Sequence, residues 1–111
     1  RLELQRAVME ANGDDAKPVW ITEMGWRTNA PDAAEAWQVV SPARQTTYTS
    51  DAIDFARANY PWLTHLGIWE LNGRSDDYGY ALWQGPGSTS ATYDALVAAA
   101  AERGAPPPIG R

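Results

Sequence analysis

The sequence predicts an α/β fold with parallel strands, and three observations lead to this prediction. Segments with helical periodicity alternate with short apolar runs in the order helix, strand, helix, strand, helix, which is the order of βαβ units. Both runs are short and apolar, as in strands that are buried on both faces. Long connections follow each run, whereas the links from helix to strand are short. Because such loops build the active sites of parallel α/β proteins, we expect any function at the carboxyl ends of the strands.

The first helix and the first strand are predicted before residue 24. Apolar and small residues recur at helical spacing near the start of the chain, at Leu4, Ala7, Val8 and Ala11. Gly13 stands where a helix-ending glycine belongs. Pro18 then opens the strand Val19–Thr22, which stops at Glu23. A long connection over residues 24–41 follows, and a connection of that length is usually functional.

The rest of the chain repeats this pattern. Ser41 and Pro42 form a strong helix start, and the helix is expected to reach Asn59. On one side it should bury Ala52, Ile53, Phe55 and Ala56. The second strand is predicted at Leu66–Trp69, followed by Glu70 and a long loop over residues 71–89. Ser90 caps a last helix with an apolar stripe (Tyr93, Leu96, Val97 and Ala100), which ends at Gly104 before a Pro-rich tail, residues 105–111.

Composition excludes several classes of function. The net charge is −5 and the nine basic residues are scattered, so we expect neither a nucleic-acid nor an anionic-membrane partner. No apolar run approaches the roughly 20 residues that span a bilayer. The chain has no cysteine and a single histidine, His65, which excludes thiolate and multi-histidine metal sites. We expect no metal site, and we also expect no cofactor. Six tryptophans and five tyrosines stand against one phenylalanine, and such aromatic residues suit wet, concave surfaces.

Glu23 is the strongest candidate for a chemical role. A carboxylate directly after a buried strand lies at the mouth of a sheet, where partial desolvation can prepare a nucleophile. The structural alternative is a carboxylate that caps the next turn or pairs with Arg27. Two parallel strands also leave both sheet edges open, so we expect the chain to be part of something larger.

The segment Lys17–Trp26 (KPVWITEMGW) resembles the seventh strand of retaining glycosidases of clan A, the largest (β/α)8-barrel clan, which includes families 5 and 39. In those enzymes a Val/Ile-x-Ile/Val-Thr-Glu-x-Gly stretch carries the nucleophile. The segment Leu66–Asn72 (LGIWELN) resembles the eighth strand, where a tryptophan lines the floor of the sugar site. Tyr78–Leu82 and the helix after it resemble the closing loop and last helix of these barrels. The resemblance extends from about residue 3 to about residue 101.

The resemblance implies that residues 1–104 are the C-terminal part of a TIM-barrel catalytic domain, with Glu23 as its nucleophile. The catalytic acid follows the fourth strand in these families, so it would come from the missing N-terminal part or from another chain. Glu70 is a weak alternative, because side chains alternate along a strand and Glu70 should point away from the barrel interior if Trp69 points inward. The expected sugar contacts are Trp69, Trp26, Trp83, Asn72 and Tyr78. Trp20 and Trp62 are expected in the core, and His65 is expected to be structural.

The function expected from the resemblance is a secreted, extracellular hydrolase that acts on a carbohydrate substrate. Two alternatives stay open. The chain could be a non-catalytic carbohydrate-binding remnant of such a barrel, which differs only in whether a catalytic acid is supplied. It could also be a small doubly wound α/β domain of unrelated role. Against that last alternative, neither strand is followed by a Gly-rich phosphate-binding loop.

Overall fold

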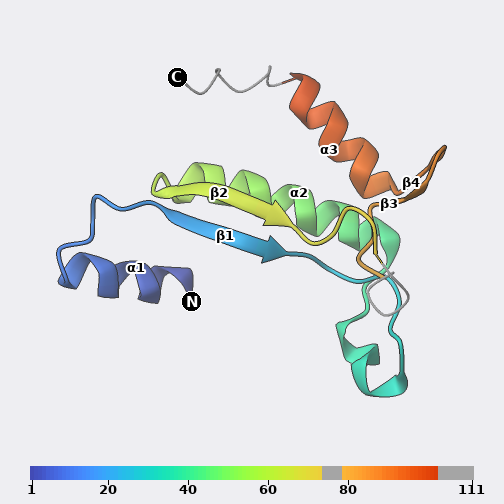
Figure 1. Cartoon of the computed structure of the whole chain (residues 1–111), viewed down its shortest axis with the longest axis horizontal. Helices are drawn as coiled ribbons and strands as arrows, with labels where there is room; N and C mark the ends of the chain where they lie inside the picture. Colours follow the sequence, from blue (N-terminus) through green and yellow to red (C-terminus); the bar gives the residue numbers. More distant parts are fainter. Residues whose placement is uncertain (74–78, 103–111) are drawn as a thin grey trace.

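The structure is a computed structural model that describes residues 1–73 and 79–102 (Figure 1). Its elements are α1 (Leu2–Ala11), β1 (Val19–Met24), the 3₁₀ helix η1 (Ala33–Gln38), α2 (Pro42–Asn59), β2 (Leu63–Ile68), β3 (Trp83–Gly85), β4 (Ser88–Thr89) and α3 (Ala91–Glu102). The predicted order of helices and main strands is confirmed. The hairpin of β3 and β4 was not predicted. The proposed helix end at Gly104 and the Pro-rich tail lie outside the described residues.

The two main strands form a parallel sheet, and α2 is the connection between them. Trp20 pairs with His65, Ile21 with Leu66 and Met24 with Ile68. This confirms the predicted α/β fold with parallel strands. The predicted strand bounds were partly wrong, because β1 continues through Glu23 to Met24 and β2 runs from Leu63 to Ile68. Backbone hydrogen bonds define a strand whatever its side chains, so the apolar run marked only part of each.

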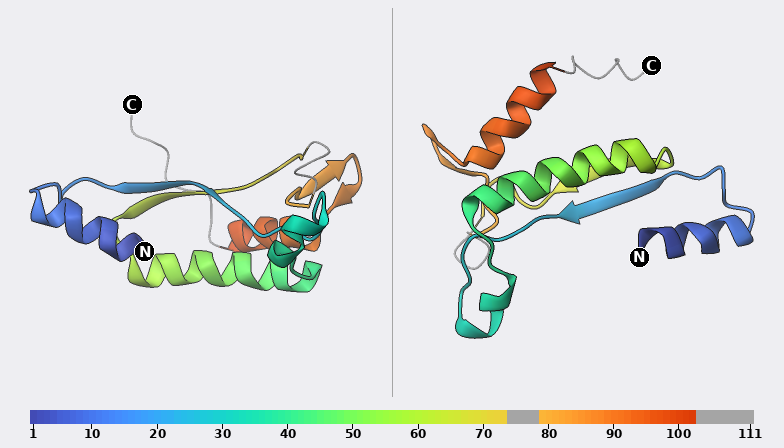
Figure 2. Two further views of the ribbon diagram at one scale, coloured as in Figure 1. Left: turned by 90° about the horizontal axis from the view of Figure 1, so that it is seen from below. Right: turned by 180° about the vertical axis from the view of Figure 1, so that it is seen from behind.

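All three α-helices lie on one side of this sheet (Figure 2, left). Within residues 1–73 and 79–102, no helix covers the opposite face. Ile21 faces the cavity on the α2 side, so the alternation of side chains puts Trp20 on the open face. Trp20 is 66% exposed, so its predicted core position is wrong. Its indole N–H donates to Thr64 Oγ1 over 3.0 Å, and its ring lies 5.4 Å from that of His65. The sequence of β1 is typical of a strand that is buried on both faces. In the described chain, helices cover only one of these faces.

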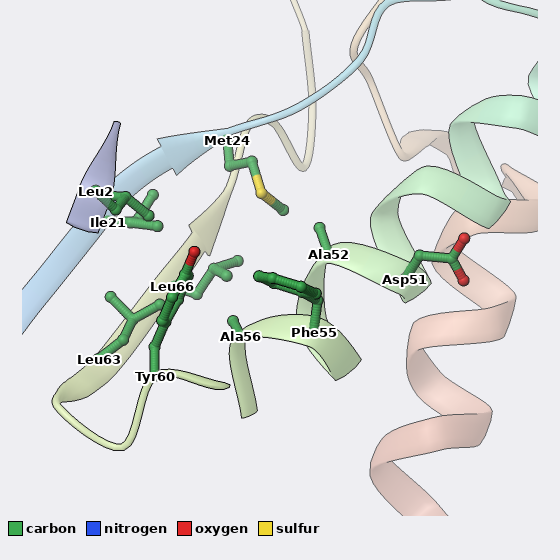
Figure 3. Close-up of a pocket in the computed structure, with 10 residues that line it drawn as sticks. All are labelled: Leu2, Ile21, Met24, Asp51, Ala52, Phe55, Ala56, Tyr60, Leu63 and Leu66. Atoms are coloured by element: carbon green, nitrogen blue, oxygen red, sulfur yellow. The ribbon is translucent and has the colours of Figure 1, made fainter. Parts of the chain in front are cut away.

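The face toward α2 is incompletely packed. A cavity of about 390 Å³ lies between α1, the sheet and α2, and Ile21, Met24 and Leu66 line it on the sheet side (Figure 3). Phe55 lines the same cavity from α2 and is 56% exposed, so the prediction that α2 buries this ring is wrong. Close packing of an interior normally leaves few voids larger than a water molecule. The residue spacing predicted the apolar side of α2 correctly, but too little of the described chain lies against it.

The helix α1 forms as predicted, yet its apolar stripe is not buried. Leu4 and Val8 are both largely exposed, and the helix is held mainly by polar contacts. Arg6 donates to the carbonyl of Lys17 over 3.0 Å, and the Tyr60 hydroxyl donates to Glu3. Trp62, also expected in the core, is half-buried next to Tyr60, at 4.8 Å between ring centroids.

The contact between α2 and α3 is polar and well buried. Thr92 Oγ1 donates to Gln45 Oε1 over 3.0 Å and lies 3.0 Å from Thr46 Oγ1. The hydroxyls of Ser41 and Ser90 accept hydrogen bonds from the first turns of α2 and α3, which confirms both predicted caps. Gly13 has φ +78°, the left-handed conformation expected where α1 ends. Within the described ranges, no helix is long and apolar enough to cross a membrane.

Candidate functional site

Glu23 and Trp69 lie on the same pocket at the carboxyl ends of β1 and β2. The pocket has a volume of about 310 Å³, is open to solvent, and is lined by Glu23, Met24, Gly25, Trp69 and Tyr80. One carboxylate and two aromatic residues therefore share this pocket. A carboxylate next to an aromatic ring can hold a sugar, since a pyranose offers hydroxyl groups and an apolar face.

The backbone brings these two residues together. The Trp69 N–H donates to the carbonyl of Met24 over 2.8 Å, which extends the parallel pairing just beyond both strands. Gly25 packs directly against the Trp69 carbonyl, and a Cβ at this position would overlap with that oxygen. The same Cβ would stand 3.3 Å from Cδ1 of Tyr80. Glycine at position 25 therefore allows the two chain segments to approach closely beneath the pocket.

Tyr80 is a pocket residue that the sequence analysis did not select. The Arg27 guanidinium lies over its ring, 5.1 Å from the centroid, and its hydroxyl donates to Gln38 Oε1 over 3.3 Å. Gly79 comes close to the backbone of Asn29, and the Thr28 N–H donates to the Gly79 carbonyl over 2.7 Å. The position of Tyr80 after a glycine in an aromatic loop was the available signal. The predicted contact in this loop was Tyr78, which lies outside the described residues.

Arg27 holds the loop beside the pocket and does not neutralise Glu23. Its side chain is buried and forms a salt bridge with Glu35, and its Nε donates to the Asn29 carbonyl over 2.7 Å. The structural alternative in which Arg27 pairs with Glu23 is therefore not observed. Glu23 is exposed, and its carboxylate makes no hydrogen bond or ion pair within residues 1–73 and 79–102. The partial desolvation expected for Glu23 is absent from the described chain.

Gln45 links the loops around the pocket to the helices. This buried side chain donates to the carbonyl of Trp26 over 2.7 Å and to that of Gly79 over 3.5 Å, and it accepts from Thr92. One amide thus joins the segment after β1, the Tyr80 loop and α3. An amide that satisfies several backbone and side-chain partners at once holds them in one arrangement.

Among the described residues, three other expected sugar contacts, Trp26, Trp83 and Asn72, are not in the pocket lining. Trp26 is half-buried, with its ring 5.7 Å from that of Tyr48 on α2. Trp83 is half-buried at the start of β3, where its N–H donates to the Leu71 carbonyl over 2.7 Å. Asn72 is exposed. These positions follow from tertiary contacts of the loops, which residue type alone does not determine.

Glu70 does not line the pocket either. It is half-buried, and its carbonyl accepts a hydrogen bond from the Leu82 N–H over 3.0 Å. The pocket therefore contains one carboxylate, Glu23, among the described residues. Within these residues there is also no group of three or more His, Asp or Glu side chains placed to hold a metal ion.

Comparison of the chain with protein-family models, with curated proteins and with solved structures finds no match. The class of protein that the fold and pocket define is therefore an α/β chain in which the described residues place one carboxylate and two aromatic residues at the carboxyl edge of a parallel sheet.

Proposed function

We propose that this chain is the C-terminal part of a retaining (β/α)8-barrel glycosidase and that Glu23 is the catalytic nucleophile. The observation that supports this proposal is the pocket shared by Glu23 and Trp69 at the ends of adjacent parallel strands. In parallel α/β enzymes the catalytic groups come from this edge of the sheet. The open sheet face, the open sheet edges and the unfilled cavity beside α2 support the view that further strands and helices belong around this chain.

In the proposed reaction, a Glu23 carboxylate oxygen attacks the anomeric carbon while the bond from that carbon to the leaving-group oxygen breaks. A carboxylic acid in another part of the barrel, or in another chain, protonates that oxygen. Water then attacks the glycosyl-enzyme ester and releases Glu23, with the second residue now acting as base. Retaining enzymes need the two carboxyl groups about 5–5.5 Å apart.

The aromatic pocket residues have a binding role in this proposal. Trp69 offers its ring face to the C–H groups of the sugar, and Tyr80 closes the pocket on another side. The exposure of Glu23 in the described chain fits a site that only the remaining barrel and the substrate close off from water. The substrate is a glycan, and on this proposal the protein acts outside the cell.

The test is covalent trapping in the full-length protein that carries this chain. A panel of 2-fluoro glycosides forms a slowly hydrolysed glycosyl ester with a retaining nucleophile, and peptide mass spectrometry then locates the sugar. We expect the label on the peptide that contains Glu23. A label on another carboxylate would refute the assignment. Oligosaccharide binding without hydrolysis or labelling would instead favour a carbohydrate-binding remnant.

A further inference from the structure

Trp37 is the most exposed aromatic residue among those described, and it projects from the loop beside the pocket. Its side chain is 82% exposed, and it makes no hydrogen bond or ring contact within residues 1–73 and 79–102. Single exposed apolar residues are common on protein surfaces. Two features distinguish Trp37 from such a residue: the place of its loop relative to the pocket, and the contacts that hold the loop backbone.

Four other exposed apolar side chains have an explanation in the layers of the fold. Trp20 lies on the uncovered sheet face, Phe55 borders the cavity beside α2, and Leu4 and Val8 lie on α1. Each belongs to an element that packs in a layer. Trp37 lies on η1, in a loop that extends beyond the carboxyl ends of β1 and β2 (Figure 1). This is the edge of the sheet where the pocket lies.

The backbone of this loop is firmly held. Asp32 caps η1 by accepting hydrogen bonds from the N–H groups of Ala34 and Glu35, over 2.8 and 3.2 Å. Glu35 pairs with the buried Arg27, and the Val40 N–H donates to the Arg27 carbonyl over 2.9 Å. A loop whose backbone is fixed in this way needs less ordering when a ligand binds, which lowers the entropic cost of binding.

The same loop is connected to the pocket through Tyr80. The residue after Trp37, Gln38, accepts a hydrogen bond from the Tyr80 hydroxyl over 3.3 Å. Tyr80 lines the pocket with Glu23 and Trp69. Trp37 is therefore next in sequence to a residue that contacts Tyr80, and Tyr80 lines the pocket.

We infer that Trp37 is a rim subsite that stacks on a sugar unit beyond the one held at Glu23, so that it favours longer oligosaccharides. This inference rests on the proposed function and adds a specificity-determining residue to it. Tryptophan supplies a large, stiff apolar face together with one N–H donor. A sugar unit that leaves the pocket toward η1 would meet this face, with its C–H side against the indole.

The test measures binding without turnover. The full-length protein with Glu23→Gln is titrated calorimetrically with cello-, xylo- and manno-oligosaccharides of increasing length. For the series that binds, adding Trp37→Ala should raise Kd about tenfold for the longer members, the size expected when a central tryptophan contact is truncated. The shortest member that binds should be unaffected. Trp37→Phe should keep most of the affinity. Val39 is a neighbouring exposed residue on the loop, and Val39→Ala should change the Kd of neither the longer nor the shortest oligosaccharides.

Two outcomes would overturn the inference. In the first, Trp37→Ala leaves Kd unchanged for every oligosaccharide length, or raises Kd by the same factor at all lengths. The other is a large fall in Tm without any length-dependent loss of affinity, because Trp37 would then pack against protein. If Glu23→Gln protein binds no oligosaccharide while the wild type is not labelled by any 2-fluoro glycoside, the proposed function itself fails. Labelling at Glu23 together with a Trp37-independent Kd refutes the rim subsite alone.

Discussion

The carbonyl of Trp69 lies against Gly25, so closely that no side chain larger than hydrogen fits between them. This contact joins the ends of β1 and β2 directly beneath the pocket, next to the hydrogen bond from Trp69 to Met24. The separation of Glu23 and Trp69 therefore depends on a glycine, and this dependence can be tested.

Gly25→Ala should separate the two strand ends and move Trp69. Overpacking of this kind costs about 1–3 kcal/mol of stability, and urea denaturation of the full-length protein would measure it. The rate of labelling by a 2-fluoro glycoside should fall as well. Gly13→Ala is the matched control: its Cβ would meet open space, but φ +78° strains an alanine. It should lower stability with no effect on labelling. Normal stability and labelling in Gly25→Ala would contradict the structure.

Glu23→Gln keeps the shape of the pocket and removes the nucleophile. Turnover should fall by several orders of magnitude while substrate still binds. In Glu23→Gly, added azide should restore cleavage with inverted anomeric configuration, because the small anion fits the vacated space and attacks in place of the carboxylate. Glu70→Gln, the control just after the neighbouring strand, should be much milder and act on binding or stability. Near-normal turnover in Glu23→Gln would end the assignment.

The docking of α1 should depend on pH. The hydrogen bond from Tyr60 lowers the pKa of Glu3 from 4.5 to about 2. Because the folded pKa lies below the unfolded value, the stabilisation is fully present above about pH 4.5 and is lost as the pH falls toward 2. Fluorescence of Trp62, which stacks on Tyr60, should change over this range. In Tyr60→Phe the part of the fluorescence change that comes from Glu3 should disappear. If Tyr60→Phe has the same fluorescence-pH curve as the wild type, the hydrogen bond between Tyr60 and Glu3 is ruled out.

Residues 1–111 expressed alone should be oligomeric, aggregated or poorly folded. In the described chain, β1 and β2 form a two-stranded sheet with both outer edges unpaired, and one sheet face is uncovered. Such edges and apolar surfaces associate with other chains. Light scattering and a thermal melt would measure this behaviour. A monodisperse monomer with a cooperative melt would show that these surfaces need no partner.

Much of the fold could be predicted because its signals are local. The bounds of α2 agree with the prediction, since Ser41, Pro42 and Pro61 act on the backbone next to them. The meeting of Glu23 and Trp69 could also be expected, because each follows or ends a strand and parallel strands bring their carboxyl ends to one edge. Parallel pairing in the sheet therefore brings two residues that are distant in sequence to the same pocket.

The sequence by itself thus determined the alternation of elements, the parallel pairing and the carboxylate at the sheet edge, since periodicity, caps and strand direction follow from nearby residues. Only the tertiary structure decided that Tyr80 completes the pocket and that Arg27 pairs with Glu35 and not with Glu23. It also decided that Trp20 and Phe55 are exposed. The physical reason is that burial and side-chain partners depend on which distant segments pack together. Residue spacing along the chain does not determine that packing.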